Sequence, residues 1–202
     1  HEGYIKRNPV TLYRAQHSGG KGKIGTTTRE EDFVEYLFVA STHSYILFFT
    51  TVGKVYWIKV HELPQAGRAA RGKPIVNLLQ LEEGEKVSAF LAVREFQESR
   101  FVVFATKKGL IKKTELMAYA NPRPSGIRAI GLEQGDEMIG VRLTDGQQEI
   151  ILSTLDGQSI RFKEAKVRPT GRGTYGVFGM RLDKGDAVVS MEILSLGADI
   201  LT

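Results

Sequence analysis

The chain has 202 residues, of which 42% are hydrophobic and 25% charged, a composition typical of globular proteins with a packed core. It contains no cysteine, which excludes a disulfide framework and a thiolate metal site. No apolar run approaches the roughly 18 residues of a membrane span, so we predict no membrane partner. A net charge of +5 and a pI of about 9.4 instead favour a polyanionic partner.

A hairpin built around a glycine turn recurs four times along the chain. The turn glycines are Gly3, Gly53, Gly109 and Gly157, at intervals of 50, 56 and 48 residues. Each is followed by a short alternating run that contains cations, over residues 4–7, 54–59, 110–113 and 158–163. Self-similarity at this period predicts a propeller-like array, in which each small sheet buries its faces by stacking on its neighbours.

Further strands are predicted on either side of the hairpin turns. The incoming strands are Tyr45–Thr50, Phe101–Thr106 and Glu149–Thr154, which are rich in β-branched and aromatic residues. A second glycine turn, acidic in each repeat, occurs at Gly84, Gly135 and Gly185. The apolar runs that follow these turns are Val87–Val93, Met138–Leu143 and Val188–Leu194. We therefore predict four strands in each repeat.

These patterns define one domain, 1–202, made of repeat units 1–44, 45–99, 100–147 and 148–197. Residues 198–202 match the first strand of a further unit. The chain begins at a turn that lacks its incoming strand, and it stops at a strand that lacks its turn. Because unpaired strand edges are a liability, we expect the domain to be truncated at both ends.

Positive charge is segregated by loop type. The loop after each glycine hairpin contains cations and no acid, whereas the turns at Gly84, Gly135 and Gly185 are acidic. The loop cations that we select as candidate DNA contacts are Arg14, Lys21, Lys23, Arg68, Arg71, Lys73, Arg123, Arg128, Arg168 and Arg172. If equivalent loops share one side of the array, these cations form an arc that suits a bent phosphate backbone. The basic loops contain few aromatic residues, so duplex binding is favoured over single-strand stacking.

The first basic loop carries a family resemblance. It reads Gln16, His17, Ser18, Gly19, Gly20, Lys21, Gly22, and it resembles the heptapeptide box in the C-terminal domain of the DNA gyrase A subunit. Residues 30–33, 40–43, 71–79 and 161–164 are similar to the same family, so the resemblance covers the whole chain. It implies an all-β fold, the β-pinwheel, which is a propeller-like disc of four-stranded blades that exchange strands. About four blades are expected here.

The resemblance also implies a function. Members of this family wrap duplex DNA around a basic rim with positive handedness, so that ATP-driven strand passage elsewhere in the enzyme yields negative supercoils. The implied partners are duplex DNA, the N-terminal cleavage domain of the gyrase A subunit and the gyrase B subunit, in the bacterial cytoplasm. No catalytic residue, metal site or cofactor is expected in this domain, and ATP and magnesium are expected elsewhere in the parent enzyme.

The box departs from the family pattern at two positions. His17 and Ser18 stand where the family has basic residues, which leaves Lys21 as the permanent cation, flanked by Arg14 and Lys23. Protonation of His17 restores one charge, since a histidine titrates near pH 6.5. Two alternatives stay open: the C-terminal domain of the topoisomerase IV A subunit, which lacks an intact box, and a propeller that serves as a protein-binding scaffold. A scaffold leaves the charge pattern of the loops unexplained.

Overall fold

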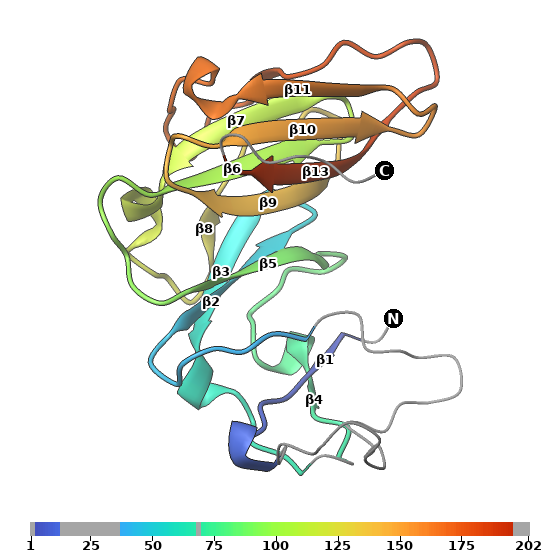
Figure 1. Cartoon of the computed structure of the whole chain (residues 1–202). Helices are drawn as coiled ribbons and strands as arrows, with labels where there is room; N and C mark the ends of the chain where they lie inside the picture. The colour runs from blue at the N-terminus through green and yellow to red at the C-terminus, as the bar shows by residue number, and fades with distance from the viewer. Residues whose placement is uncertain (1–2, 13–36, 68–69, 196–202) are drawn as a thin grey trace, which may run out of the picture.

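The computed structural model describes residues 3–12, 37–67 and 70–195. Their regular elements are β-strands and short 3-10 helices, and they form successive small antiparallel sheets that we call blades 1 to 4 (Figure 1). Blade 1 contains β1 (Tyr4–Ile5) and β4 (Lys73–Pro74). No helix among these residues is long and apolar enough to cross a membrane.

Blades 2 and 3 each contain four strands. Blade 2 has the order β5 (Val87–Val93), β2 (Tyr45–Thr50), β3 (Lys54–Lys59), β8 (Ile127–Arg128). Blade 3 has the order β9 (Met138–Thr144), β6 (Phe101–Thr106), β7 (Leu110–Glu115), β12 (Val177–Phe178). Blade 4 comprises β13 (Val188–Leu194), β10 (Glu149–Thr154) and β11 (Ser159–Lys163). The 3-10 helices are η1 (Val10–Leu12), η2 (Val60–Glu62), η3 (Ile75–Asn77), η4 (Leu116–Tyr119) and η5 (Glu164–Lys166).

The long strands confirm the prediction from β-type periodicity. The bounds of β2, β5, β6, β10 and β13 are those expected from the sequence, and β9 extends one residue further, to Thr144. Blades 2, 3 and 4 are each built on a hairpin whose turn glycine has a positive φ, such as +76° at Gly53 and +83° at Gly109. Such turns favour glycine because it has no Cβ.

The shortest strands are exchanged between repeats. β8 belongs to the third repeat but pairs with β3 of the second, through Val55 and Ile127. β12 of the fourth repeat pairs in the same way with β7, through Ile111 and Val177. A blade of this type is therefore completed by the repeat that follows it, which is the strand exchange that the family resemblance implied.

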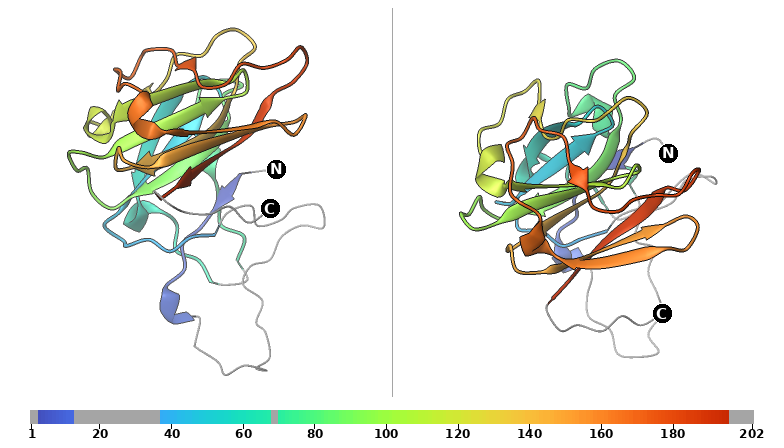
Figure 2. Two further views of the ribbon diagram at one scale, coloured as in Figure 1. Left: turned by 45° about the horizontal axis from the view of Figure 1, so that its top comes forward. Right: turned by 90° about the horizontal axis from the view of Figure 1, so that it is seen from above.

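The exchanged strands lie on the outer side of the array. The third long strands, β5, β9 and β13, contact one another from blade to blade, so they lie on the side where the blades meet. Within blades 2 and 3, β8 and β12 occupy the opposite edge of the sheet. Two further views show the stacked sheets and the loops that carry these short strands (Figure 2). We call this opposite edge the rim.

Apolar side chains fill the space between blades. Phe49 of blade 2 and Phe104 of blade 3 are buried, and their rings meet edge to face with centroids 5.4 Å apart. A second buried cluster, which includes Ile111 and Leu152, lies between blades 3 and 4. Stacking of blades therefore supplies the core, as expected for repeats that cannot bury both faces alone.

The acidic turns have a structural role that charge counting did not predict. In each of three turns, the acidic residue after the turn glycine folds inward: Glu85, Asp136 and Asp186. Glu85 accepts hydrogen bonds from the Tyr56 hydroxyl at 2.9 Å and from the Glu82 N–H at 2.8 Å. Asp136 and Asp186 accept backbone N–H groups of the adjacent hairpin, from Lys108 and Asp156. Each carboxylate therefore ties its acidic turn to the neighbouring glycine hairpin.

Two charged residues are buried together between blades 3 and 4. Lys113 is 4% exposed and Glu164 is fully buried, with Nζ 3.9 Å from Oε1. Lys113 Nζ also donates to the Glu164 carbonyl at 3.1 Å, and the Thr144 hydroxyl donates to the carboxylate. Glu164 is the first residue after β11 of blade 4. The equivalent residue in blade 3, the first after β7, is the buried Leu116. An ion pair thus occupies a site where the preceding repeat has an apolar residue.

Removal of one partner should leave the other charge buried alone. We expect Glu164→Ala to lower the free energy of unfolding by about 3–5 kcal/mol, measured by urea denaturation. The double variant Lys113→Met/Glu164→Leu, which restores an apolar contact, should recover most of that loss. Equal destabilisation by the single and double variants would contradict this account of the pair.

Candidate nucleic-acid interface

The third basic loop, residues 116–132, is held in shape by a glycine that packs on blade 2. The Gly126 N–H donates to the Arg123 carbonyl at 2.9 Å, which closes a turn just before β8. Gly126 has a φ of +71°, and a Cβ at this position would lie 2.8 Å from Cζ of Tyr56. Tyr56 is buried and bound to Glu85. The turn therefore rests on a fixed aromatic ring.

The fourth basic loop, residues 167–182, lies next to the third. The Gly131 N–H donates to the Thr174 carbonyl at 3.0 Å, which joins the segment after β8 to the loop that precedes β12. A Cβ on Gly173 would lie 3.6 Å from Cδ of Arg128, so the two loops are in van der Waals reach. The consequence is that Arg172 and Arg128, which are far apart in sequence, lie side by side.

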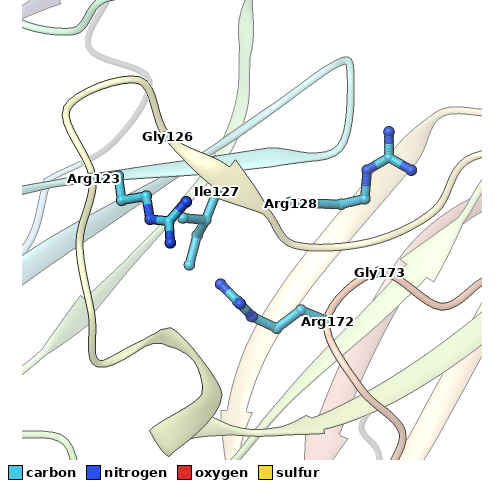
Figure 3. Close-up of a pocket in the computed structure, with 6 residues that line it drawn as sticks. All are labelled: Arg123, Gly126, Ile127, Arg128, Arg172 and Gly173. Atoms are coloured by element: carbon cyan, nitrogen blue, oxygen red, sulfur yellow. The ribbon is translucent and has the colours of Figure 1, made fainter.

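The two loops border an open hollow of about 520 Å³ on the rim, which we call the arginine hollow. It is lined by Arg123, Gly126, Ile127, Arg128, Arg172 and Gly173. Figure 3 shows the Arg123 and Arg172 side chains extending toward one another, while Arg128 extends away from them. No acidic residue is part of this lining.

Among the described residues, the three arginines have no counterion. All three are exposed, and within the described ranges none of them forms an ion pair with a carboxylate or donates a side-chain hydrogen bond. Arginine presents planar donors that match phosphate and carboxylate oxygens in pairs. Unpaired guanidinium groups gathered in a hollow are therefore available to an external anion.

The remaining described candidates do not line this hollow. Arg168 is exposed on the same loop as Arg172, and Lys73 is exposed on β4. Arg71 is half-buried, and its guanidinium carbon lies 3.9 Å from the centroid of the Tyr4 ring. Arg71 is thus engaged with an aromatic face, a contact that is often favourable for a cation.

The heptapeptide box lies outside the described residues. The candidates in this position are Arg14, Gln16, His17, Ser18, Gly19, Gly20, Lys21, Gly22 and Lys23, and Arg68 is likewise outside. They stay predictions from the sequence. Within the part of the chain that is described, no group of three or more histidine, cysteine, aspartate and glutamate side chains is placed to hold a metal ion.

Exposed aromatic residues occur in one basic loop, contrary to the expectation that these loops show few. Tyr175 is 54% exposed and Phe178 is 75% exposed, both at the rim of blade 3. Sequence reasoning missed them because strand-edge aromatics resemble core residues until the neighbouring sheet is placed. It also missed the glycines before the exchanged strands, although Gly72, Gly126 and Gly176 recur at 54 and 50 residues and could have revealed these strands.

The support under the arginine hollow can be tested directly. Gly126→Ala should lower stability by about 1–2 kcal/mol or more, because the left-handed backbone costs that amount for an alanine and the new methyl group meets the Tyr56 ring. Gly171→Ala is the matched control, since nothing lies within 4 Å of a Cβ there. Thermal unfolding of both variants decides the matter, and equal melting temperatures would contradict the described packing.

The described residues form an all-β array of strand-exchanging blades, and arginines that form no ion pair among these residues lie on its rim. These features define a propeller-like protein with a basic outer surface. The family model for the DNA gyrase C-terminal domain, a beta-propeller, matches residues 1–41, 44–94, 100–145 and 148–195. The chain belongs to this family. The resemblance seen in the sequence and the β-pinwheel fold that it implied are thereby confirmed.

The relatives found by sequence are DNA gyrase A subunits. That of Salmonella typhimurium is 49% identical over 202 residues, which cover 100% of this chain and 23% of that protein. That of Escherichia coli is 48% identical over 202 residues, with 100% and 23% covered. The protein from Neisseria gonorrhoeae is 44% identical over 229 residues, with 95% and 25% covered. The chain thus spans about a quarter of the length of these relatives.

Two solved structures share the fold. The crystal structure of the C-terminal domain of DNA topoisomerase IV has a TM-score of 0.80 and 30% identity, covering 96% of this chain and 59% of that one. The structure of a DNA gyrase A C-terminal domain has a TM-score of 0.73 and 25% identity, covering 94% and 61%. The whole-chain identities of 43–49% favour gyrase over topoisomerase IV.

Proposed function

We propose that this chain binds duplex DNA along its rim, bends it and wraps it with positive handedness as a domain of a DNA gyrase. The observation that carries the proposal is the arginine hollow, whose lining contains Arg123, Arg128 and Arg172 and no acidic residue. Membership of the gyrase C-terminal family supports the same function. Phosphate is the anion that such a hollow suits, because arginine binds it bidentately.

Backbone binding fits the geometry better than base readout. The described rim carries loops and two-residue strands, and it presents no helix that could enter a major groove. Bending a site of 20 to 30 base pairs by 40 to 90° costs about 1–6 kcal/mol. Phosphate contacts repeated from blade to blade offset this cost without reading sequence.

The activity of the parent enzyme is part of the same proposal. Wrapping presents a DNA segment to the strand-passage machinery of a type II topoisomerase in the bacterial cytoplasm, and negative supercoils result. In this proposal the chemistry belongs to the cleavage domain of the A subunit and to the B subunit, with ATP and magnesium bound there. The heptapeptide box, with His17, Ser18 and Lys21, is proposed to add DNA contacts from the first repeat.

Salt dependence should distinguish this function from a protein-binding scaffold. If Z phosphates are neutralised, log K falls against log salt with a slope of about −0.9Z, and contacts from several blades imply Z of roughly 4 to 8. Arg128→Gln and Arg172→Gln should each reduce the slope by about 1 on any duplex sequence. Fluorescence anisotropy over a salt series measures both quantities.

The matched control is Arg94→Gln. Arg94 is exposed and follows β5 at the end of blade 2 remote from the Gly53 turn, so its loss should leave the slope unchanged. A flat salt response for the unaltered chain would contradict DNA binding by the rim. Preference for single-stranded over duplex DNA would instead assign the binding to Tyr175 and Phe178.

A further inference from the structure

A buried lysine is bonded to the chain segment that carries Arg128. Lys112 lies on β7 and is only 1% exposed, with its chain packed between blades 2 and 3. Its Nζ donates hydrogen bonds to the Thr114 hydroxyl and, at 3.0 Å, to the Ala129 carbonyl. Ala129 follows Arg128 in the chain. The ammonium group is therefore bonded to the segment that carries one of the three hollow arginines.

Both backbone polar groups of Ala129 are engaged. Its N–H donates to the Gly53 carbonyl at 2.8 Å, across the strand exchange. Its carbonyl accepts two donors, Lys112 Nζ and the Tyr119 hydroxyl, the latter also at 3.0 Å. The backbone next to Arg128 is thus fixed to blade 2 on one side and to the side chains of blade 3 on the other.

The surroundings of Lys112 contain no counter-charge. The Phe104 ring of β6 lies with its centroid 5.1 Å from Nζ, and Thr114 of β7 is uncharged. The titratable group from η4 is the Tyr119 hydroxyl. Burial raises its pKa well above the usual value, although the Thr114 hydrogen bond and the nearby Arg172 charge act in the opposite direction. Arg128 is the charged neighbour along the bonded segment. Among the described residues no carboxylate forms an ion pair with Lys112, unlike the adjacent Lys113.

A buried cation without a counterion costs stability, and such groups are concentrated at functional sites. Here the charge is bonded to the segment that carries Arg128, one of the three arginines that also form no ion pair among the described residues. Burial lowers the pKa of Lys112 from 10.5 to about 8. Burial therefore disfavours the charged form of Lys112 in the free protein, and a nearby anion would favour that form.

We propose that Lys112 is a positioning residue of the arginine hollow, which holds the backbone beside Arg128 and binds a proton when a DNA phosphate occupies the hollow. This inference rests on the proposed DNA-binding function. A phosphate favours the charged form of a neighbouring amine. DNA binding is then tightest below about pH 8 and weakens as the pH rises through the pKa of the free lysine.

The size of the effect follows from linkage. At a pH equal to the pKa of the free side chain, about half of the molecules carry the proton, so DNA binding takes up as much as about half a proton per complex. Each unit by which DNA raises the pKa of Lys112 strengthens binding about tenfold between the high-pH and low-pH limits.

Proton uptake can be measured by titration calorimetry. The full chain is titrated with duplex DNA at pH 8 in two buffers of different ionisation enthalpy, and the difference in apparent enthalpy gives the number of protons bound. The unaltered chain should take up about half a proton more than Lys112→Met and Lys112→Arg. Lys112→Met should also bind DNA more weakly at pH 7, with affinity that no longer depends on pH between about 7.5 and 9.

The matched control is the double variant Lys113→Met/Glu164→Leu. It removes a buried lysine from the neighbouring position of the same strand, but one that is paired and faces blade 4, so proton uptake should stay as in the unaltered chain. If Lys112→Met does not fold, an NMR pH titration of the Lys112 side chain in the unaltered chain, free and with DNA, tests the same linkage. An upward shift of its pKa on binding supports the inference.

The outcomes separate the two proposals. DNA binding with no Lys112-dependent proton uptake, or with an unshifted Lys112 pKa, overturns the inference and leaves the proposed function in place. Equal loss of uptake in the Lys113 control also overturns it, because the effect would then follow from general changes in packing. Absence of DNA binding at every pH overturns the proposed function itself.

Discussion

The backbone hydrogen bonds between one repeat and the hairpin turn of the repeat before it determine where the functional side chains lie. The Gly53 carbonyl accepts the N–H groups of Ala129 and Ile130, and the Gly109 carbonyl accepts those of Gly179 and Met180. A Cβ at Gly53 would lie 2.4 Å from the Ile130 carbonyl oxygen, so the approach requires glycine. Residues 129–130 and 179–180 lie near the ends of the third and fourth basic loops. Their hydrogen bonds to the turn glycines therefore hold both loops at the rim.

This arrangement places the residues that stabilise the fold and the residues proposed to bind DNA in different parts of each blade. Blade stacking buries Phe49 against Phe104. At the rim, β8 carries Arg128, and the loops before β8 and β12 carry Arg123 and Arg172. The two lysines of β7 serve opposite faces: Lys113 pairs with Glu164 toward blade 4, whereas Lys112 donates to the uncharged Ala129 carbonyl beside Arg128. In the proposed function, this rim holds phosphate-binding groups at intervals set by the repeat, which suits a bent duplex better than a straight one.

Much of the fold was predictable because long strands follow local patterns. Strands such as Tyr45–Thr50 and Val87–Val93 were located correctly from β-branched and aromatic runs beside glycine turns. The two-residue strands were not, since β8 pairs with a strand of the preceding repeat and two residues carry no periodicity. The rim cations were predicted by loop charge, but their meeting in one hollow depends on that pairing. The burial of Lys112 was also beyond sequence reasoning, because a charged residue reads as exposed until its partner at Ala129 is known.

The central claim is that the rim arginines wrap duplex DNA, and the topology of closed circles tests it most directly. Nicked circular DNA is sealed by ligase in the presence of the full chain, and the linking number is read from gels after the protein is removed. The account predicts a positive shift that grows with bound protein and is strongly reduced in the Arg123→Gln/Arg128→Gln/Arg172→Gln variant. Saturating binding with no shift, or an equal shift in the triple variant, would contradict it.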